Sequence, residues 1–249
     1  MHTTDAMASP TRHRTVPVGD GFVITQRTWR LLAHATLVTV VTNSRAVPGD
    51  FFQTAAPGVG DVFVVFNRHR FTFDDRLAAR TIWVHRLDEA SGTFFGDSPA
   101  DDATSRAFHR LYVAGDAPEH FPTTAGANYA SYRGRLPGIA GYPVGRRLPA
   151  VRGKVRRIVS PSTGFLVFAW LEALQRLGAG FRTRAIGVGR EYDGWPGHDW
   201  EFERRHLRRS VIDFRTPDGR PDRWYGLLDA IPYGLVRTAW KMRALNPFR

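Results

Sequence analysis

One of the nine histidines stands where this sequence could place a general base. His198 follows a Pro-Gly pair, which favours a turn, and directly precedes Trp200–Arg209, whose pattern predicts a short charged helix. Asp199 is expected to cap that helix, and Glu203 falls in its first turn, where acidic side chains are favoured. Neutral imidazole has a pKa of about 6.5, which suits proton abstraction at neutral pH. His198 is therefore the candidate catalytic residue, and the alternative is a surface or capping histidine.

A second group of residues could bind an anion. The segment 161–164, with the sequence Pro-Ser-Thr-Gly, directly precedes Phe165–Leu177, which is apolar nearly all round and is followed by Gly178. This pattern predicts a buried helix with a glycine stop. The free N–H groups at a helix N-terminus attract anions, and the two hydroxyl groups add donors. The simpler interpretation is an N-cap for a core helix, and both can hold together.

Two asparagines complete the set of candidate polar groups. Asn43 and Ser44 follow the β-branched run Thr36–Val41, and Asn67 directly follows Asp61–Phe66, which is apolar on both faces as in a central parallel strand. The carboxyl ends of such strands form the edge at which open α/β sheets bind ligands. An amide there can both donate and accept, which suits a nucleobase, a ribose or a phosphate. Alternatively, each asparagine closes a turn by bonding its own backbone.

The elements that would position these residues indicate an α/β fold. Further strands are predicted at Thr81–His85, Leu111–Ala114, Val155–Val159 and Arg182–Val188. Because the predicted strands alternate with helical segments, we expect a single Rossmann-like domain whose mostly parallel sheet is flanked by helices. Residues 115–150 are predicted to form a long functional loop. We divide the chain into a flexible tail at 1–20, an α/β domain at 21–215 and a basic, aromatic segment at 216–249.

Composition excludes several chemistries. The chain has 249 residues, a formal charge of +12 and no cysteine, so thiol nucleophiles and thiolate metal sites are excluded. The motifs GxxxxGK[ST], HExxH and DxD are absent, and no metal site is expected. Lys154 and Lys241 are the only lysines among 35 basic residues. A nearly pure arginine excess is more typical of a high-GC coding bias than of a nucleic-acid-binding surface, so no nucleic acid partner is expected.

The three groups of residues, in this order, resemble the long, short and very short motifs of the sialyltransferase family of inverting glycosyltransferases. The corresponding segments are 43–67, 161–165 and 198–203, the last fitting H-x4-E. The resemblance covers roughly residues 36–70 and 155–210. It implies the sialyltransferase-type fold, with one Rossmann-like sheet between helices. It also implies a reaction that needs no cofactor, with a CMP-activated sugar as co-substrate.

The resemblance also implies roles by position. His198 would deprotonate the acceptor hydroxyl group, which attacks the anomeric carbon with inversion while CMP leaves. The residues implied to bind the donor are Asn43, Ser44, Asn67, Ser162, Thr163 and Gly164. The asparagines would contact the CMP portion, and the Ser-Thr-Gly segment would line the ribose and the carboxylate of the sugar. Asp199 and Glu203 would support His198.

The chain departs from the family pattern at defined positions. Val65 replaces the arginine of the family's R-x-N, and Thr42 replaces the glycine that precedes the first asparagine. The cysteines that the family joins in a disulfide are absent, as expected for a bacterial cytoplasmic member. The family's histidine that steadies the leaving phosphate is also missing, and we expect Arg190 or Tyr192 to take its place.

The C-terminal part is basic and aromatic. From Arg204 to Arg249 there are 11 Lys and Arg against 4 Asp and Glu. This segment either docks on an anionic membrane, where a lipid-linked acceptor would lie, or packs on the sheet with a solvated basic face. The first 20 residues lack the apolar centre of a signal peptide, and the longest apolar stretch is far below the ~20 residues of a membrane span. We therefore expect a cytoplasmic protein, either free or peripheral on the inner membrane.

Together these observations predict a bacterial glycosyltransferase. It would transfer a CMP-activated acidic sugar, sialic acid or keto-deoxy-octulosonate, to a surface glycan or glycolipid in a metal-independent, inverting reaction. One alternative is a non-catalytic protein that binds nucleic acid or an anionic glycan through its basic surface. The other is a degenerate transferase that binds CMP without turnover.

Overall fold

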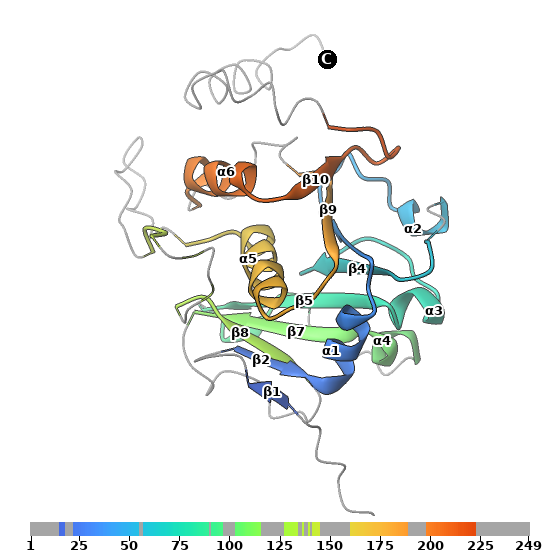
Figure 1. The fold of residues 1–249 in the computed structure, drawn as a ribbon, viewed down its shortest axis with the longest axis horizontal. Helices are drawn as coiled ribbons and strands as arrows, with labels where there is room; N and C mark the ends of the chain where they lie inside the picture. Colours follow the sequence, from blue (N-terminus) through green and yellow to red (C-terminus); the bar gives the residue numbers. More distant parts are fainter. Residues whose placement is uncertain are drawn as a thin grey trace, which may run out of the picture.

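A computed structural model describes residues 15–17, 22–54, 57–89, 91–96, 103–115, 127–133, 136, 139, 141–144, 160–188 and 198–222. These residues form an α/β structure in which helices flank one mostly parallel sheet, consistent with a single Rossmann-like domain (Figure 1). The strands are β1 (Thr15–Pro17), β2 (Phe22–Thr25), β3 (Leu37–Val41), β4 (Asp61–Phe66), β5 (Thr81–Asp88), β6 (Thr93–Phe94), β7 (His109–Ala114), β8 (Asn128–Ser131), β9 (Arg182–Ile186) and β10 (Ile212–Arg215). The helices are α1 (Gln26–Ala33), α2 (Phe51–Thr54), α3 (Asp75–Ala78), α4 (Ala103–Ala107), α5 (Thr163–Arg176) and α6 (Trp200–Arg209).

The strand order places a topological switch point beside β3. The sheet runs β1-β2-β8-β7-β5-β4-β3-β9-β10, and β6 pairs with β5 off this path. All neighbours from β8 to β10 are parallel, whereas β1 and β2 join antiparallel at one edge. The chain moves outward from β3 as far as β8 and then returns to β9 on the other side of β3. Ligands in open α/β sheets bind outside the carboxyl ends of the strands near such a reversal.

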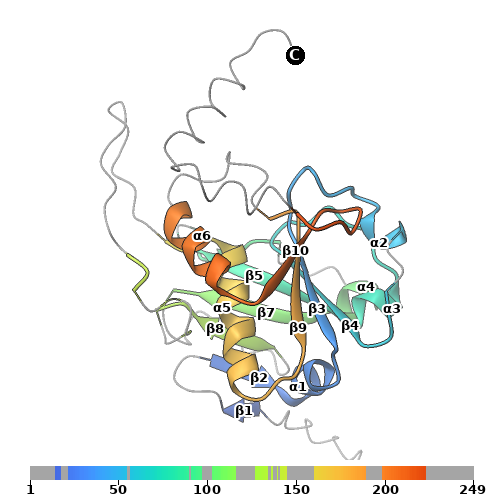
Figure 2. The ribbon, with the colours of Figure 1, turned by 45° about the horizontal axis from the view of Figure 1, so that its top comes forward.

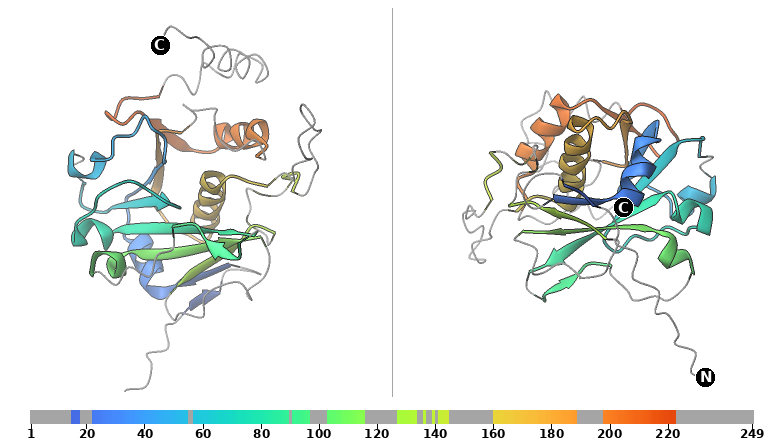
Figure 3. Two further views of the ribbon diagram at one scale, coloured as in Figure 1. Left: turned by 180° about the vertical axis from the view of Figure 1, so that it is seen from behind. Right: turned by 60° about the horizontal axis from the view of Figure 1, so that its bottom comes forward.

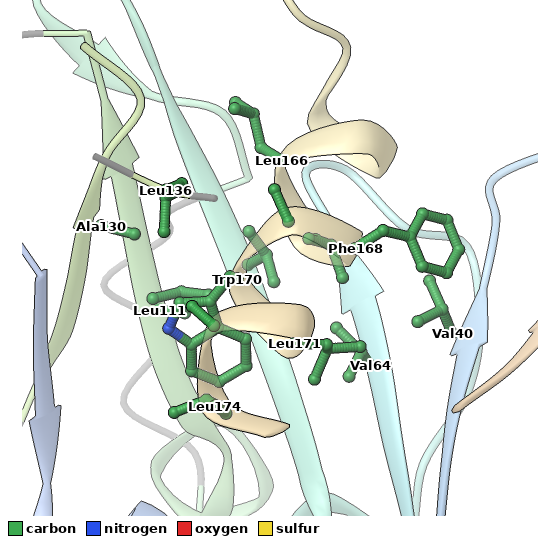
Figure 4. Close-up of a cluster of buried hydrophobic side chains, with 14 of the residues drawn as sticks. Val40, Val64, Leu111, Ala130, Leu136, Leu166, Phe168, Trp170, Leu171 and Leu174 are labelled. Atoms are coloured by element: carbon green, nitrogen blue, oxygen red, sulfur yellow. The ribbon is translucent and has the colours of Figure 1, made fainter. Parts of the chain in front are cut away.

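Helix α5 carries the chain across the sheet from β8 to β9 and forms the centre of the core. Its N-cap is Ser162, whose Oγ accepts a hydrogen bond from the backbone N–H of Phe165 at 3.1 Å. It ends before Gly178, which has a φ of 97°. Figure 4 shows Trp170 and Leu171 of this helix among the buried side chains of the sheet. The predictions of a core helix, of a cap within the segment 161–164 and of a glycine stop are confirmed.

The two faces of the sheet bury separate apolar clusters. Residues of α1, α5 and α6 share one cluster with Val62 and Val64 of β4, and Figure 3 (right) shows these helices on one side of the sheet. Phe63 and Val65 of the same strand point to the other face, as strand geometry requires, and pack against α2. Helices α5 and α6 therefore lie together on one face, as Figure 2 also shows.

The structure confirms the strands predicted at β3, β4, β5, β7 and β9 and the helix at α6, with ends that differ by a few residues at most. Five short strands, β1, β2, β6, β8 and β10, lie where the sequence predicts none. Strand β8 falls inside the expected loop at 115–150, and β1 falls inside the expected tail at 1–20 and pairs with β2. The strand predicted at Val155–Val159 and residues 223–249 of the C-terminal segment lie outside the described residues. In the part of the chain that the structure describes, each helix is too short or too polar to cross a bilayer.

Candidate functional site

The three predicted groups of residues come together at the carboxyl edge of the sheet. The side chain of Asn67, directly after β4, donates a hydrogen bond from Nδ2 to Oγ1 of Thr163 at 3.1 Å. Glu203 of α6 accepts a hydrogen bond from the backbone N–H of Ser162 at 2.7 Å. Segments that are far apart in the sequence thus meet around the N-terminus of α5, beside β4 and β5.

Asn67 joins two strands to the start of α5. Its backbone is left-handed, with a φ of 55°, a conformation that asparagine tolerates better than most residues. Its carbonyl oxygen accepts a hydrogen bond from Nε1 of Trp83 at 2.9 Å, and its side-chain Oδ1 accepts one from the backbone N–H of Arg86 at 3.3 Å. The amide of Asn67 is therefore engaged within the protein, and its contact with the donor stays a prediction.

We expect two variants of Asn67 to separate backbone conformation from side-chain bonding. Asn67→Gly keeps access to a positive φ and loses the amide hydrogen bonds, which should cost about 1–2 kcal/mol of unfolding free energy. Asn67→Ala loses the same bonds and also resists the left-handed conformation, which should cost about 1 kcal/mol more. Urea unfolding of both variants measures the difference. Equal stability of the two would contradict a left-handed backbone at this position.

Asn43 presents a buried acceptor with no donor. Its Nδ2 donates to the backbone carbonyl oxygen of Phe66 at 2.8 Å, while its Oδ1 is buried without a hydrogen-bond partner among the described residues. A buried, unsatisfied polar atom is costly, so Oδ1 is suited to accept a hydrogen bond from a ligand. The hydroxyl group of Ser44 instead accepts from the backbone N–H of Ala46 at 3.2 Å and closes the turn.

Ser162 and Glu203 form a buried clamp between α5 and α6. The Oγ of Ser162 donates to Oε2 of Glu203 at 2.6 Å, and the hydroxyl group of Tyr142 lies 2.9 Å from Oε1. Glu203 is only 3% exposed. Both hydrogen-bond donors of Ser162 are thus directed to Glu203, and its Oγ also caps α5. These contacts within the protein account for a serine at this position. A Cβ added to Gly164 would meet Phe66 at an ordinary 3.8 Å, so the described residues do not require glycine there.

Burial raises the pKa of Glu203 to about 7, against hydrogen bonds from Ser162 and Tyr142 that lower it. The unfolded chain releases this proton near 4.5, so the folded state binds it more tightly. The stability that this group contributes is then complete below about pH 4.5 and is lost as the pH rises through about 7. We expect the Tm of the wild type to fall between about pH 5 and 8 relative to that of Glu203→Gln. Parallel pH profiles of the two proteins would refute this.

His198 is held in one tautomer. Its Nδ1 lies 2.6 Å from the backbone carbonyl oxygen of Ser160, which can only accept, so the proton is on Nδ1 and the lone pair is on Nε2. Burial lowers the pKa of His198 to about 4, and the charge of Arg86 lowers it further. Asp199 caps α6, as predicted, by accepting a hydrogen bond from the backbone N–H of Phe202 at 3.0 Å. The imidazole is therefore neutral and oriented at neutral pH.

Arg86 is a residue of this edge that the sequence does not single out. It lies in the part of β5 beyond the predicted strand Thr81–His85, and its Nη2 donates to Oγ of Ser160 at 3.1 Å. Its Nη1 donates to the backbone carbonyl oxygen of Pro161. Its guanidinium carbon lies 5.5 Å from the ring centroid of Tyr132. The only signal in the sequence is a basic residue just after a predicted strand, at the edge where ligands bind.

The arrangement thus combines a neutral imidazole, a guanidinium group, a buried carboxyl group and an amide oxygen that receives no hydrogen bond from the described residues. Comparisons with protein-family models, curated proteins and solved structures give no match to this chain. The chemistry of the site is therefore argued from its own geometry.

Arg190 and Tyr192 lie outside the described residues. Among the residues that the structure does describe, no three His, Cys, Asp or Glu side chains are grouped so that they could hold a metal ion. An open cleft of about 360 Å³ lies elsewhere, between α5, β9 and the segment that links α6 to β10. None of the predicted site residues lines it.

Proposed function

We propose that this protein is a glycosyltransferase that moves a CMP-activated acidic sugar, sialic acid or keto-deoxy-octulosonate, onto a bacterial surface glycan or glycolipid without a metal. The observation that carries the proposal is the position of His198. Its imidazole is fixed through the Ser160 carbonyl oxygen at the sheet edge where Asn43 and Asn67 also lie. The proposal places the protein in the cytoplasm, either free or peripheral on the inner membrane through residues 216–249, where a lipid-linked acceptor would lie.

The proposed reaction uses His198 as the general base. Nε2 accepts the proton of the acceptor hydroxyl group as its oxygen attacks the anomeric carbon, and the bond from that carbon to the phosphate oxygen breaks. The electron pair of that bond leaves with CMP, and the anomeric configuration inverts. A pKa of about 4 keeps the imidazole unprotonated before the donor binds. A bound anion close by would raise that pKa and strengthen the base.

The proposal is tested by binding and turnover. Purified protein is titrated with CMP, with UMP and GMP as controls, and is then incubated with CMP-sialic acid or CMP-keto-deoxy-octulosonate and candidate acceptors while CMP release is measured. Preferential CMP binding together with transfer supports the proposal. CMP binding without transfer to any acceptor would instead indicate the degenerate transferase. Strongly salt-dependent polyanion binding without CMP preference would indicate the non-catalytic binding protein.

A further inference from the structure

Among the residues that the structure describes, Arg86 forms no ion pair, although its charge lowers the pKa of the buried carboxyl group of Glu203. Its guanidinium group donates two hydrogen bonds among the described residues, both to neutral oxygens, those of Ser160 and Pro161. The nearby carboxyl groups have other partners, because Glu203 binds Ser162 and Glu89 accepts from Tyr132. A half-buried guanidinium group that donates only to neutral oxygens lacks the further compensation that a directly bound anion gives. An incoming anion would supply that compensation.

The position of Arg86 places such an anion beside the base. Ser160 contacts both groups, since its Oγ accepts from Arg86 and its carbonyl oxygen accepts from His198. The backbone N–H of Arg86 also donates to Oδ1 of Asn67 at 3.3 Å, which ties this residue to the turn after β4. Arg86 is thus linked to the turn of the predicted donor site through its backbone and, through Ser160, to the imidazole. Its planar fork can bind two oxygens of one phosphate or carboxylate.

We propose that Arg86 binds the phosphate of the CMP portion of the donor, an inference that rests on the proposed function. When the bond between the anomeric carbon and the phosphate oxygen breaks, the negative charge on the phosphate increases. A guanidinium group stays protonated at every physiological pH, so it can stabilise this charge without taking up or releasing a proton. Arg86 would then stabilise the leaving phosphate, which is the role expected for Arg190 or Tyr192 from the resemblance.

The test compares ligands that differ by one anionic group. Affinities for cytidine, CMP and CMP-sialic acid are measured by calorimetry for the wild type, Arg86→Gln and Arg86→Lys. Because Arg86→Gln loses a charge-assisted hydrogen bond to the phosphate, this variant should bind CMP about 10- to 100-fold more weakly than the wild type does. Its affinity for cytidine should be unchanged. Arg86→Lys should recover part of the loss, because it keeps the charge without the fork. The control is Arg182→Gln, which removes an exposed arginine at the first residue of β9, away from the carboxyl edge of the sheet. This variant should bind all three ligands like the wild type.

Each outcome decides a different question. A wild type that does not bind CMP would remove the proposed function and this inference with it. CMP binding that is equal in the wild type and in Arg86→Gln would overturn the inference alone. An equal loss of cytidine and CMP affinity would mean that Arg86 only holds Ser160 and Pro161 in place, and would overturn it as well. A loss confined to CMP-sialic acid would assign Arg86 to the sugar carboxylate instead of the phosphate. If Arg86→Gln does not fold, the same comparison is made with Arg86→Lys, with a smaller loss expected for CMP alone.

Discussion

Replacing His198 with alanine should lower the rate of sugar transfer by about 10²- to 10⁴-fold while the affinity for CMP stays unchanged. The physical reason is that the imidazole is held in the tautomer whose lone pair is on Nε2, and is unprotonated at neutral pH. Its loss removes the proton acceptor but leaves the amides of Asn43 and Asn67 in place. The measurements are kcat from the release of CMP and Kd for CMP by calorimetry.

A second histidine of the same helix provides the control. His206 lies on α6 with its Nε2 3.1 Å from a carboxylate oxygen of Glu172, at the side of the helix that packs on α5. His206→Ala should keep kcat within about twofold of the wild type, since surface and packing changes away from a site act mainly on stability. An equal fall of kcat in both variants, or a fall of CMP affinity in His198→Ala, would show that His198 acts through the fold and not through proton transfer.

Local patterns in the sequence were sufficient for the elements that build the centre of the sheet. Strands β3 and β4 are continuous apolar runs bounded by polar turns, and α5 is apolar on nearly every side. The burial of these elements on both faces can therefore be predicted without knowing which elements pack against them. The start of α6 follows from Asp199, whose capping role depends only on the next three residues. Asn67 could be placed at the carboxyl edge for the same reason, because it directly follows a strand.

Strand β8 could not be predicted, because its stability comes from distant partners. This strand has only four residues, Asn128–Ser131, and is partly polar, which is typical of a loop. Asn128 is nevertheless fully buried, and its Oδ1 accepts a hydrogen bond from the backbone N–H of Thr25 at 2.9 Å. That bond links residues 103 positions apart, so no local pattern indicates it.

The same reason separates the predicted site residues from those that sequence reasoning missed. Arg86 meets Ser160 across 74 positions and Tyr142 meets Glu203 across 61, and each of these contacts needs the folded sheet. The sequence leaves two interpretations for Ser162, a helix cap and a residue that faces an anion at the helix N-terminus. In the fold, the carboxyl group of Glu203 accepts hydrogen bonds from both donors of Ser162.

The contact between Ser162 and Glu203 should therefore be decisive for stability. We expect Glu203→Ala to lower the free energy of unfolding by about 2–4 kcal/mol at pH 6, where the folded protein still holds the Glu203 proton. The backbone N–H and hydroxyl group of Ser162 and the hydroxyl group of Tyr142 would lose a buried partner together. The start of α5 would no longer be fixed to α6, so CMP affinity should fall as well. Urea unfolding and calorimetry measure the two effects.

A matched variant on the same pair of helices shows whether the position of the carboxyl group matters. Glu172 on α5 also contacts α6, through His206, but its side chain is 20% exposed and lies away from the start of α5. Exposed ion pairs contribute little, so Glu172→Ala should cost no more than about 1 kcal/mol and leave CMP affinity unchanged. If the two alanine variants lose equal stability and equal CMP affinity, Glu203 serves general packing between α5 and α6. A large loss in Glu203→Ala alone, reversed in part by Glu203→Gln, would show that this carboxyl group holds the second and third predicted motifs in one site.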